Sequence, residues 1–309
     1  MSAEPGWARL GGEAPFLALA PMDGVTDAVF RGLLTELGGG RAGISACVSE
    51  FVRICQEPAP ARVLLQHCPE LREGGRTRAG VPVIVQLLGG APGPMARTAA
   101  LAAAMGAPGI DLNFGCPAKT VNNHDGGAAL LRCPERITAI VAAVREAVPP
   151  DVPVSAKIRV GWASSAGIEA IAAAAAAGGA AWLTVHARTR AQGYAPPVEW
   201  PAIGRARAAA WIVVSANGEL VTPADVARCA AESGCDAFMI GRGAMVDPWA
   251  FAALRGWREG EATMAELEAL WHDYYGRMVA GGAAPGRALC RVKQWLRVAA
   301  ERRADARAL

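Results

Sequence analysis

Eight short apolar segments recur along the chain, and stretches with helical periodicity lie between them. Each segment is four to six residues long and nearly uncharged, as expected of strands that are buried on both faces of a parallel sheet. The segments span residues 16–20, 44–49, 83–88, 109–112, 154–158, 182–185, 212–215 and 237–240. Eight such units in 309 residues predict a closed (β/α)8 barrel (TIM barrel) of the α/β class, with an open doubly wound sheet as the alternative.

The stretches between the apolar segments carry helix start signals. Thr222 can cap a helix that has Pro223 in its first turn and Asp225 as an early acid. Pro134 followed by Glu135 is a similar start. We therefore expect helices of the barrel at residues 26–37, 94–105, 134–148, 167–177 and 223–233.

Nearly every apolar segment ends in a polar or conformationally special residue. In a parallel barrel the carboxyl ends of all strands meet at one face, where the chemistry of such barrels takes place. Taken singly, each of these residues is an ordinary strand end, but together they predict one site. They are Pro21, Met22, Asp23, Glu50, Gln86, Asn113, Lys157, His186, Asn217, Gly218, Glu219, Gly241, Arg242 and Gly243.

Cys116 lies between a glycine and a proline, just past the end of the segment 109–112. A buried structural cysteine more often lies inside an apolar run. The placement therefore suits a thiol that faces a pocket as a nucleophile or proton donor, although a turn that merely contains a cysteine remains the alternative. With an ordinary pKa of about 8.5 the thiol is mostly protonated at neutral pH and can act as a general acid.

The remaining strand ends suggest what the pocket binds. The turns 217–219 and 241–243 contain glycines beside Arg242, which is typical of a phosphate site, although such turns also occur for steric reasons. Gln86 and Lys157 suit a flat heterocycle such as a flavin, whereas a lone strand-end lysine could also form a Schiff base or an ion pair. No GxGxxG motif follows a strand, which favours a mononucleotide over a Rossmann-bound NAD.

The pattern changes after residue 255. Residues 256–260 resemble a linker, Thr263 and Glu266 form a potential capping box that opens a helix to residue 278, and a second helix is expected from about residue 287. We therefore divide the chain into a barrel domain, 1–256, and a small helical domain, 257–309. Between residues 287 and 309 there are two acids and seven bases, a surface that attracts polyanions or is simply a solvated helix face: Arg287, Arg291, Lys293, Arg297, Arg302, Arg303 and Arg307.

The composition indicates where in the cell the protein is found and which kinds of site it can contain. The eight cysteines form no CxxC pair and the four histidines show no metal-ligand spacing, so we expect reduced thiols and no metal site. The uncharged, alanine-rich run at residues 170–185 is too short to span a membrane, and the N-terminus shows no export signal. A cytoplasmic protein is expected.

Several motifs, in order between about residues 18 and 248, resemble those of the tRNA-dihydrouridine synthases. They are APMDGVTD (20–27), VQL (85–87), DLNFGCP (111–117), KIR (157–159), HART (186–189), ANGE (216–219) and IGRG (240–243). Four others resemble the bacterial branch that modifies uridine 16: SEFVR (49–53), GCPAKTVN (115–122), QGY (192–194) and RVKQWL (291–296).

The resemblance implies a barrel that binds FMN, a helical domain that binds tRNA, and NADPH as the reductant of the flavin. A hydride would pass from FMN to C6 of uracil, and Cys116 would protonate C5. The implied FMN contacts are Pro21, Met22, Asp23, Gln86, Lys157, His186, Asn217, Gly218, Glu219, Gly241 and Arg242. The implied tRNA contacts are Arg53, Asn113, Tyr194, Arg291 and Lys293. A monomer without an obligate protein partner is expected.

The chain departs from that branch in a few places. Asp23 stands where glutamate is common, Val298 stands where an aromatic residue is usual, and the helical domain is shorter. The loop 122–127 reads NNHDGG, which leaves His124 and Asp125 without a role. Two other functions are considered, a flavin barrel that acts on a free pyrimidine and an RNA-binding barrel without catalysis. The basic end and Arg53 favour RNA over a free base, and Cys116 with Lys157 favours catalysis.

Overall fold

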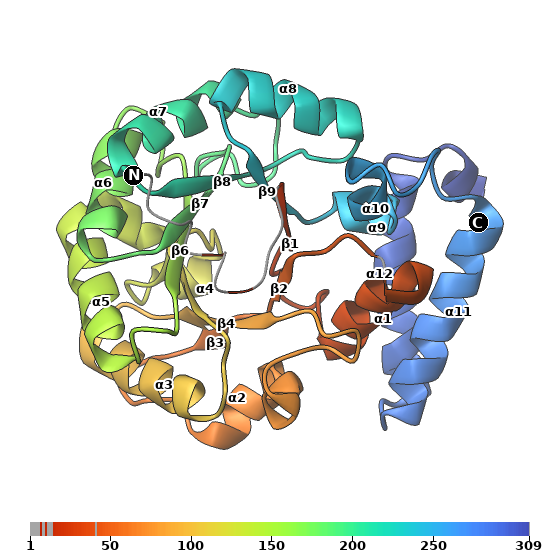
Figure 1. Ribbon diagram of the computed structural model, residues 1–309, viewed down its shortest axis with the longest axis horizontal. Coiled ribbons are helices and arrows are strands. Elements are labelled where there is room, and N and C mark those ends of the chain that lie inside the picture. Colours follow the sequence, from red (N-terminus) through yellow and green to blue (C-terminus); the bar gives the residue numbers. More distant parts are fainter. Residues whose placement is uncertain (1–6, 8–9, 11–14, 41, 309) are drawn as a thin grey trace.

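The computed structural model describes residues 7, 10, 15–40 and 42–308, and in this part of the chain eight parallel strands close into a barrel (Figure 1). Closure is seen at β2, which pairs with β1 on one side and with β4 on the other, where Cys47 is opposite Val83. The predicted TIM barrel is confirmed, and the open sheet is wrong. The barrel strands are β1 (Phe16–Leu19), β2 (Ala46–Val48), β4 (Val83–Leu88), β5 (Ile110–Asn113), β6 (Val154–Arg159), β7 (Trp182–His186), β8 (Val213–Asn217) and β9 (Ala237–Ile240).

Helices surround the barrel (Figure 1). The predicted helices are present as α1 (Ala28–Gly40), α3 (Pro92–Ala104), α5 (Pro134–Ala147), α6 (Ile168–Ala177) and α8 (Pro223–Ser233). At the start of α8, Thr222 and Asp225 form the reciprocal bonds of a capping box. The remaining elements were not predicted: β3 (Val52–Arg53), α2 (Ala61–His67), η2 (Pro69–Glu73), α4 (Lys119–Asn122), η3 (Gly127–Arg132), α7 (Trp200–Ala210), α9 (Gly243–Val246), α10 (Ala250–Leu254) and η4 (Asp305–Ala308).

The interior of the barrel is apolar at the amino ends of the strands. Phe16, Trp182 and Ala237 are the first residues of β1, β7 and β9, and all three are buried in one cluster. Trp7 stacks on Phe16 with ring centroids 4.8 Å apart and covers this end. Apolar side chains therefore fill the barrel at the amino ends of these strands.

Two helices, α11 (Met264–Ala280) and α12 (Pro285–Ala300), follow the barrel and lie beside α1 and α9 (Figure 1). The fully buried Trp295 of α12 anchors them. Its ring lies 4.6 Å from that of Phe30 and 5.5 Å from that of Tyr274, and its Nε1 donates to the carbonyl of Met245 at 2.8 Å. The two predicted helices are thus confirmed and α12 is held against the barrel, whereas the division at residue 257 stays a prediction.

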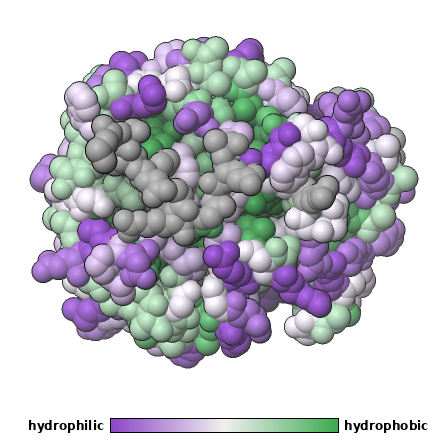
Figure 2. All heavy atoms as spheres, viewed as in Figure 1, coloured by the Kyte–Doolittle hydropathy of each residue, from purple (hydrophilic) through white to green (hydrophobic). Residues whose placement is uncertain are grey.

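The surface in Figure 2 is hydrophilic over much of its edge, including the side where Figure 1 places α11. Among the described residues, no helix has the length and apolarity needed to cross a bilayer. The prediction that the N-terminus contains no export signal falls mostly on residues outside the described part of the chain. All eight cysteines are described, and each is a free thiol.

A buried ion pair joins α1 to η2. Arg31 is fully buried, and its Nε and Nη2 donate to the two carboxylate oxygens of Glu70 at 2.9 and 2.7 Å. The guanidinium also donates to the carbonyls of Thr26 and His67. A buried charge is tolerated only with such complete pairing, so removal of one partner leaves the other uncompensated.

We expect Glu70→Ala to lower the free energy of unfolding by about 3–5 kcal/mol, because Arg31 then remains charged and unpaired in the interior. Urea denaturation measures the change. The control is Glu73→Ala, an exposed acid in the same short helix, with an expected effect within about 0.5 kcal/mol. Equal stabilities of the two variants would contradict the interpretation that the buried Arg31–Glu70 ion pair stabilises the fold.

Candidate functional site

A cavity opens at the carboxyl ends of the strands, and residues from separate strands line it. All of those named below except Tyr194, which is in the loop after β7, stand at or just beyond the end of a barrel strand, so closure of the barrel is what brings them together. The lining residues that the sequence singled out are Pro21, Met22, Asp23, Asn113, Cys116, Lys157, His186, Tyr194, Asn217, Gly218, Glu219, Gly241 and Arg242.

Five predicted site residues do not line this cavity. One of them, Glu50, accepts a hydrogen bond from the N–H of Val25 at 3.1 Å. Gln86 is fully buried, and its amide bonds to Asp111 and Asn113. The exposed Arg53 donates to the carbonyl of Thr120 at 3.0 Å, and Thr120 is in α4, the short helix that follows Cys116. The other two, Arg291 and the exposed Lys293, are on α12. Their roles stay predictions.

Lys157 and His186 both line the cavity and both have lowered pKa values, but they differ in charge at neutral pH. Burial, together with the charge of Arg159, lowers the pKa of Lys157 to about 8, and its Nζ donates to Asn217 Oδ1 at 3.1 Å. Burial and the surrounding cations, Lys157 first among them, hold the pKa of His186 well below its usual value. At neutral pH the site therefore presents a charged lysine beside a neutral imidazole.

Cys116 is half-buried and held by its main chain. The N–H groups of Gly115 and Cys116 both donate to Asn113 Oδ1 at 3.0 Å, and Asn122 Nδ2 donates to the carbonyl of Cys116 at 2.9 Å. Burial raises the pKa of the Cys116 thiol, so the thiol is protonated at neutral pH. Of the two roles that the sequence left open, this electrostatic environment favours the proton donor over the thiolate nucleophile.

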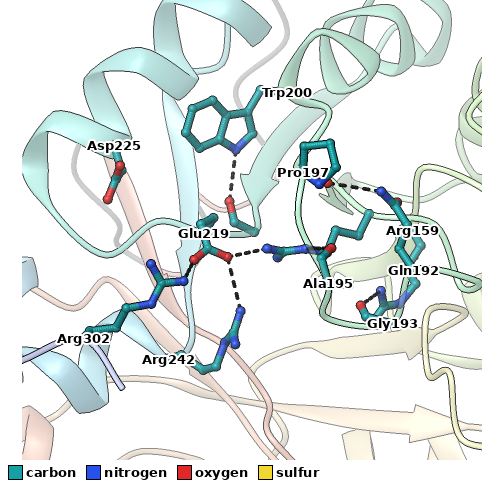
Figure 3. A network of polar contacts seen from close by, with 12 residues as sticks. Arg159, Gln192, Gly193, Ala195, Pro197, Trp200, Glu219, Asp225, Arg242 and Arg302 are labelled. Atoms are coloured by element: carbon teal, nitrogen blue, oxygen red, sulfur yellow. Dashed lines mark hydrogen bonds and ion pairs between the residues drawn. The ribbon is translucent and has the colours of Figure 1, made fainter. Parts of the chain in front are cut away.

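The far side of the cavity concentrates positive charge around one carboxylate (Figure 3). Glu219 forms ion pairs with Arg188, with Arg242 at 3.3 Å, and with Arg302 from beyond the end of α12. The preceding Gly218 has a φ of +113°, and a Cβ there would lie 3.2 Å from the main-chain nitrogen of Ala187. Three guanidinium groups against one carboxylate leave an excess of positive charge beside a glycine turn, which suits an anion such as a phosphate.

Arg159 and Arg302 were not among the predicted site residues. Arg159 stands two positions after Lys157 in β6, so the alternation of a strand places it on the same face and could have identified it. It donates to the carbonyls of Gly115 and Gly193 at 2.8 and 2.7 Å, and its guanidinium lies 5.4 Å from the ring centroid of Tyr194. Arg302 follows a helix far along the chain, and no local pattern connects it to the cavity.

The residues present fit a phosphorylated flat heterocycle. The two glycine turns with Arg242 suit its phosphate, and Met22, Lys157 and His186 line the part of the cavity where a ring would lie. Nδ1 of His186 is buried and has no hydrogen-bond partner among the described residues, and such a group calls for a partner from a bound molecule. In the described part of the chain no group of His, Cys, Asp or Glu residues is arranged to hold a metal ion.

Comparison with known proteins gives a consistent picture. The family model described as dihydrouridine synthase (Dus) matches residues 18–304. A tRNA-dihydrouridine(16) synthase of Ralstonia nicotianae is 50% identical over 250 residues, which cover 81% of this chain and 76% of the relative. Proteins of the same name from Pseudomonas putida and Salmonella typhimurium are 45% and 43% identical and cover 91% and 90% of this chain, and 86% and 88% of their own.

Solved structures with the same fold include a variant of NCR from Zymomonas mobilis and morphinone reductase in complex with tetrahydroNAD. Each has a TM-score of 0.54 and 14% sequence identity, and the matches cover 81% of this chain and 90% and 89% of the other chains. At this identity the likeness supports the barrel architecture alone.

The raised pKa of Cys116 generates a prediction. We expect iodoacetamide to alkylate Cys116 more slowly at pH 7.5 than the exposed Cys55 and Cys290, with a rate that rises with pH because only the thiolate reacts. Mass spectrometry of the peptides separates the three positions. A rate at Cys116 that is faster than at both references and independent of pH would mean a thiolate and would exclude the proton-donor assignment.

Proposed function

The chain belongs to the dihydrouridine synthase family, and from this premise we propose that it reduces uridine 16 in the D-loop of tRNA to 5,6-dihydrouridine. The site carries the proposal through one observation: a thiol whose pKa is raised by burial faces the same cavity as a buried lysine and an anion-binding turn. The position of the uridine rests on the relatives described above, which are 43–50% identical to this chain.

The proposed cofactor is FMN, with NADPH as its reductant. Its phosphate would be held by Gly218, Gly241 and Arg242, and its ring would lie against Met22 and Lys157, with the charge of the lysine at the edge of the ring. When bound, reduced FMN supplies the hydride that passes to C6 of the uracil.

Cys116 completes the reduction by giving its proton to C5, so one hydride and one proton together saturate the C5–C6 double bond. The thiol suits this step because burial raises its pKa and so keeps it protonated at neutral pH. Asn113 holds the Gly115–Cys116 turn through two main-chain hydrogen bonds, which orients the thiol without a change in its charge.

The uracil must leave its stack in the RNA to reach a cavity inside a barrel mouth. Tyr194, whose side chain lines this cavity, is 61% exposed and offers an aromatic face to an extruded base. On the rim, a Cβ at Gly24 would lie 3.1 Å from Arg291 Nη1, so α12 brings this arginine next to the turn after β1. Arg53, Arg291 and Lys293 would then bind phosphates and position the RNA without reading its sequence.

We expect Cys116→Ala to lower dihydrouridine formation by about 100-fold or more, because the C5 proton donor is lost. FMN binding and reduction by NADPH should stay within about twofold of the wild type, since no proton from Cys116 enters that step. Stopped-flow absorbance follows the flavin, and nucleoside analysis of the tRNA measures the product. Cys133→Ala is a matched control, a half-buried thiol that does not line the cavity. Undiminished product from Cys116→Ala would refute the proton-donor role.

The double variant Arg291→Ala, Lys293→Ala should weaken tRNA binding and reduce the slope of log affinity against log salt by about 1 to 2, because up to two phosphate contacts are lost. Flavin reduction should not change. The control, Arg72→Ala with Arg78→Ala, removes two other exposed charges that do not line the cavity. If both double variants bind tRNA alike at every salt concentration, α12 does not contact the RNA.

Substitution of uracil for tRNA in the turnover assay separates a free-base enzyme from this proposal.

A further inference from the structure

A row of buried polar side chains crosses three strands beneath Cys116. The sheet register places Gln86 of β4 opposite Asp111 of β5, and Asp111 opposite Ser155 of β6. All three side chains are at most 1% exposed. They lie in the interior of the barrel and do not line the cavity. None of them is explained by contact with a substrate.

The hydrogen bonds in this row converge on Asp111 from both sides. Ser155 Oγ donates to Asp111 Oδ1 at 2.6 Å, and Gln86 Nε2 donates to Asp111 Oδ2 at 2.7 Å. Asn113 Nδ2 then donates to Gln86 Oε1 at 2.9 Å. The remaining oxygen of Asn113, Oδ1, accepts the N–H groups of Gly115 and Cys116, each at 3.0 Å. The row therefore leads from Asp111 to the main chain of the reactive cysteine.

We propose that Asp111 is a positioning residue that sets the orientation of the Gln86 and Asn113 amides and thereby holds the Gly115–Cys116 turn. This proposal rests on the proposed function only in so far as Cys116 is the reacting thiol. Asp111 touches neither the cavity nor the thiol and acts through two intervening side chains.

The positions of hydrogen-bond donors and acceptors determine how the amides of Gln86 and Asn113 are turned. A primary amide has a donor end and an acceptor end, and nothing in its shape selects between them. Because Asp111 Oδ2 accepts, Gln86 must turn its nitrogen toward Asp111 and its oxygen toward Asn113. Asn113 must then turn its nitrogen toward Gln86, which leaves its oxygen for the two main-chain N–H groups. One acceptor at the start of the row thus determines the orientation of both amides.

The assignment is insensitive to the charge of Asp111. Burial raises the pKa of Asp111, whereas the hydrogen bonds from Ser155 and Gln86 and the charge of Lys157 act in the opposite direction. Even a proton on Oδ1 would face Ser155, whose hydroxyl oxygen can accept it, and Oδ2 would still accept from Gln86. The essential property is an acceptor on the side of Gln86, and an asparagine can also supply one.

Three variants separate this role from a structural one. Asp111→Ala removes the acceptor. Asp111→Asn keeps an oxygen for Gln86 and can turn its nitrogen toward the Ser155 oxygen. Ser155→Ala is the matched control, because it removes one hydrogen bond to the same carboxylate but on the side away from Cys116.

The primary readout is hydrogen exchange at the amides of Gly115 and Cys116 in the full-length protein, with and without FMN, measured by mass spectrometry of overlapping peptides. We expect exchange about tenfold faster in Asp111→Ala, as for the loss of a hydrogen bond, and within about threefold of the wild type in Asp111→Asn and Ser155→Ala. The second readout is turnover. Asp111→Ala should lower kcat for tRNA by about tenfold, with flavin reduction by NADPH within about twofold, and Asp111→Asn should restore it.

Equal exchange in Asp111→Ala and Ser155→Ala would overturn the proposal, and so would failure of Asp111→Asn to restore slow exchange. If Asp111→Ala does not fold, Gln86→Met breaks the same row one step later and must show the same fast exchange at Gly115 and Cys116. Unchanged exchange in that variant also overturns the proposal. The exchange measurement needs no substrate, so it gives its answer even where the tRNA assay shows that the proposed function is wrong.

Discussion

The site depends on a concentration of positive charge at the carboxyl-terminal mouth of the barrel. Lys157, Arg159, Arg188 and Arg242 lie at or beside one cavity, and burial opposes the charge on every one of them. Glu219 offsets part of this charge through three ion pairs, and it draws Arg302 into the group. Burial, together with this excess, lowers the pKa of His186 so that its imidazole stays neutral, and the excess also suits the cavity to an anionic ligand.

The same charge group links the helices after the barrel to the site. Trp295 is buried against α1 and α11, which determines where α12 ends. From that end Arg302 reaches Glu219, next to the glycine turn that would hold a phosphate. Arg302 thus connects α12, where we propose that tRNA binds, to the turn where we propose that a phosphate binds, and the packing of Trp295 holds that helix in place.

Sequence patterns predicted the strands well because each is a short apolar run that a barrel buries on both sides. They predicted long helices with clear start signals, such as α8 and α11, and failed at α7, where Gly204 and several arginines interrupt the apolar pattern. β3 was missed because two residues carry no periodicity. Gln86 and Asn113 were recognised as special, but Asp111 was not, since only the tertiary structure reveals that the amide of Gln86 is bonded to both Asp111 and Asn113.

What the sequence determined by itself is the alternation of apolar runs and helices, the polar residues at the ends of those runs, and the motifs around Cys116 and Lys157. These properties are local, because backbone periodicity and turn chemistry act over a few residues. Only the tertiary structure decided which polar groups face the cavity, how burial shifts their pKa values, and that Asp111 and Arg302 belong to the site. Those properties come from the shear of neighbouring strands and the packing of distant helices, which no short window of sequence contains.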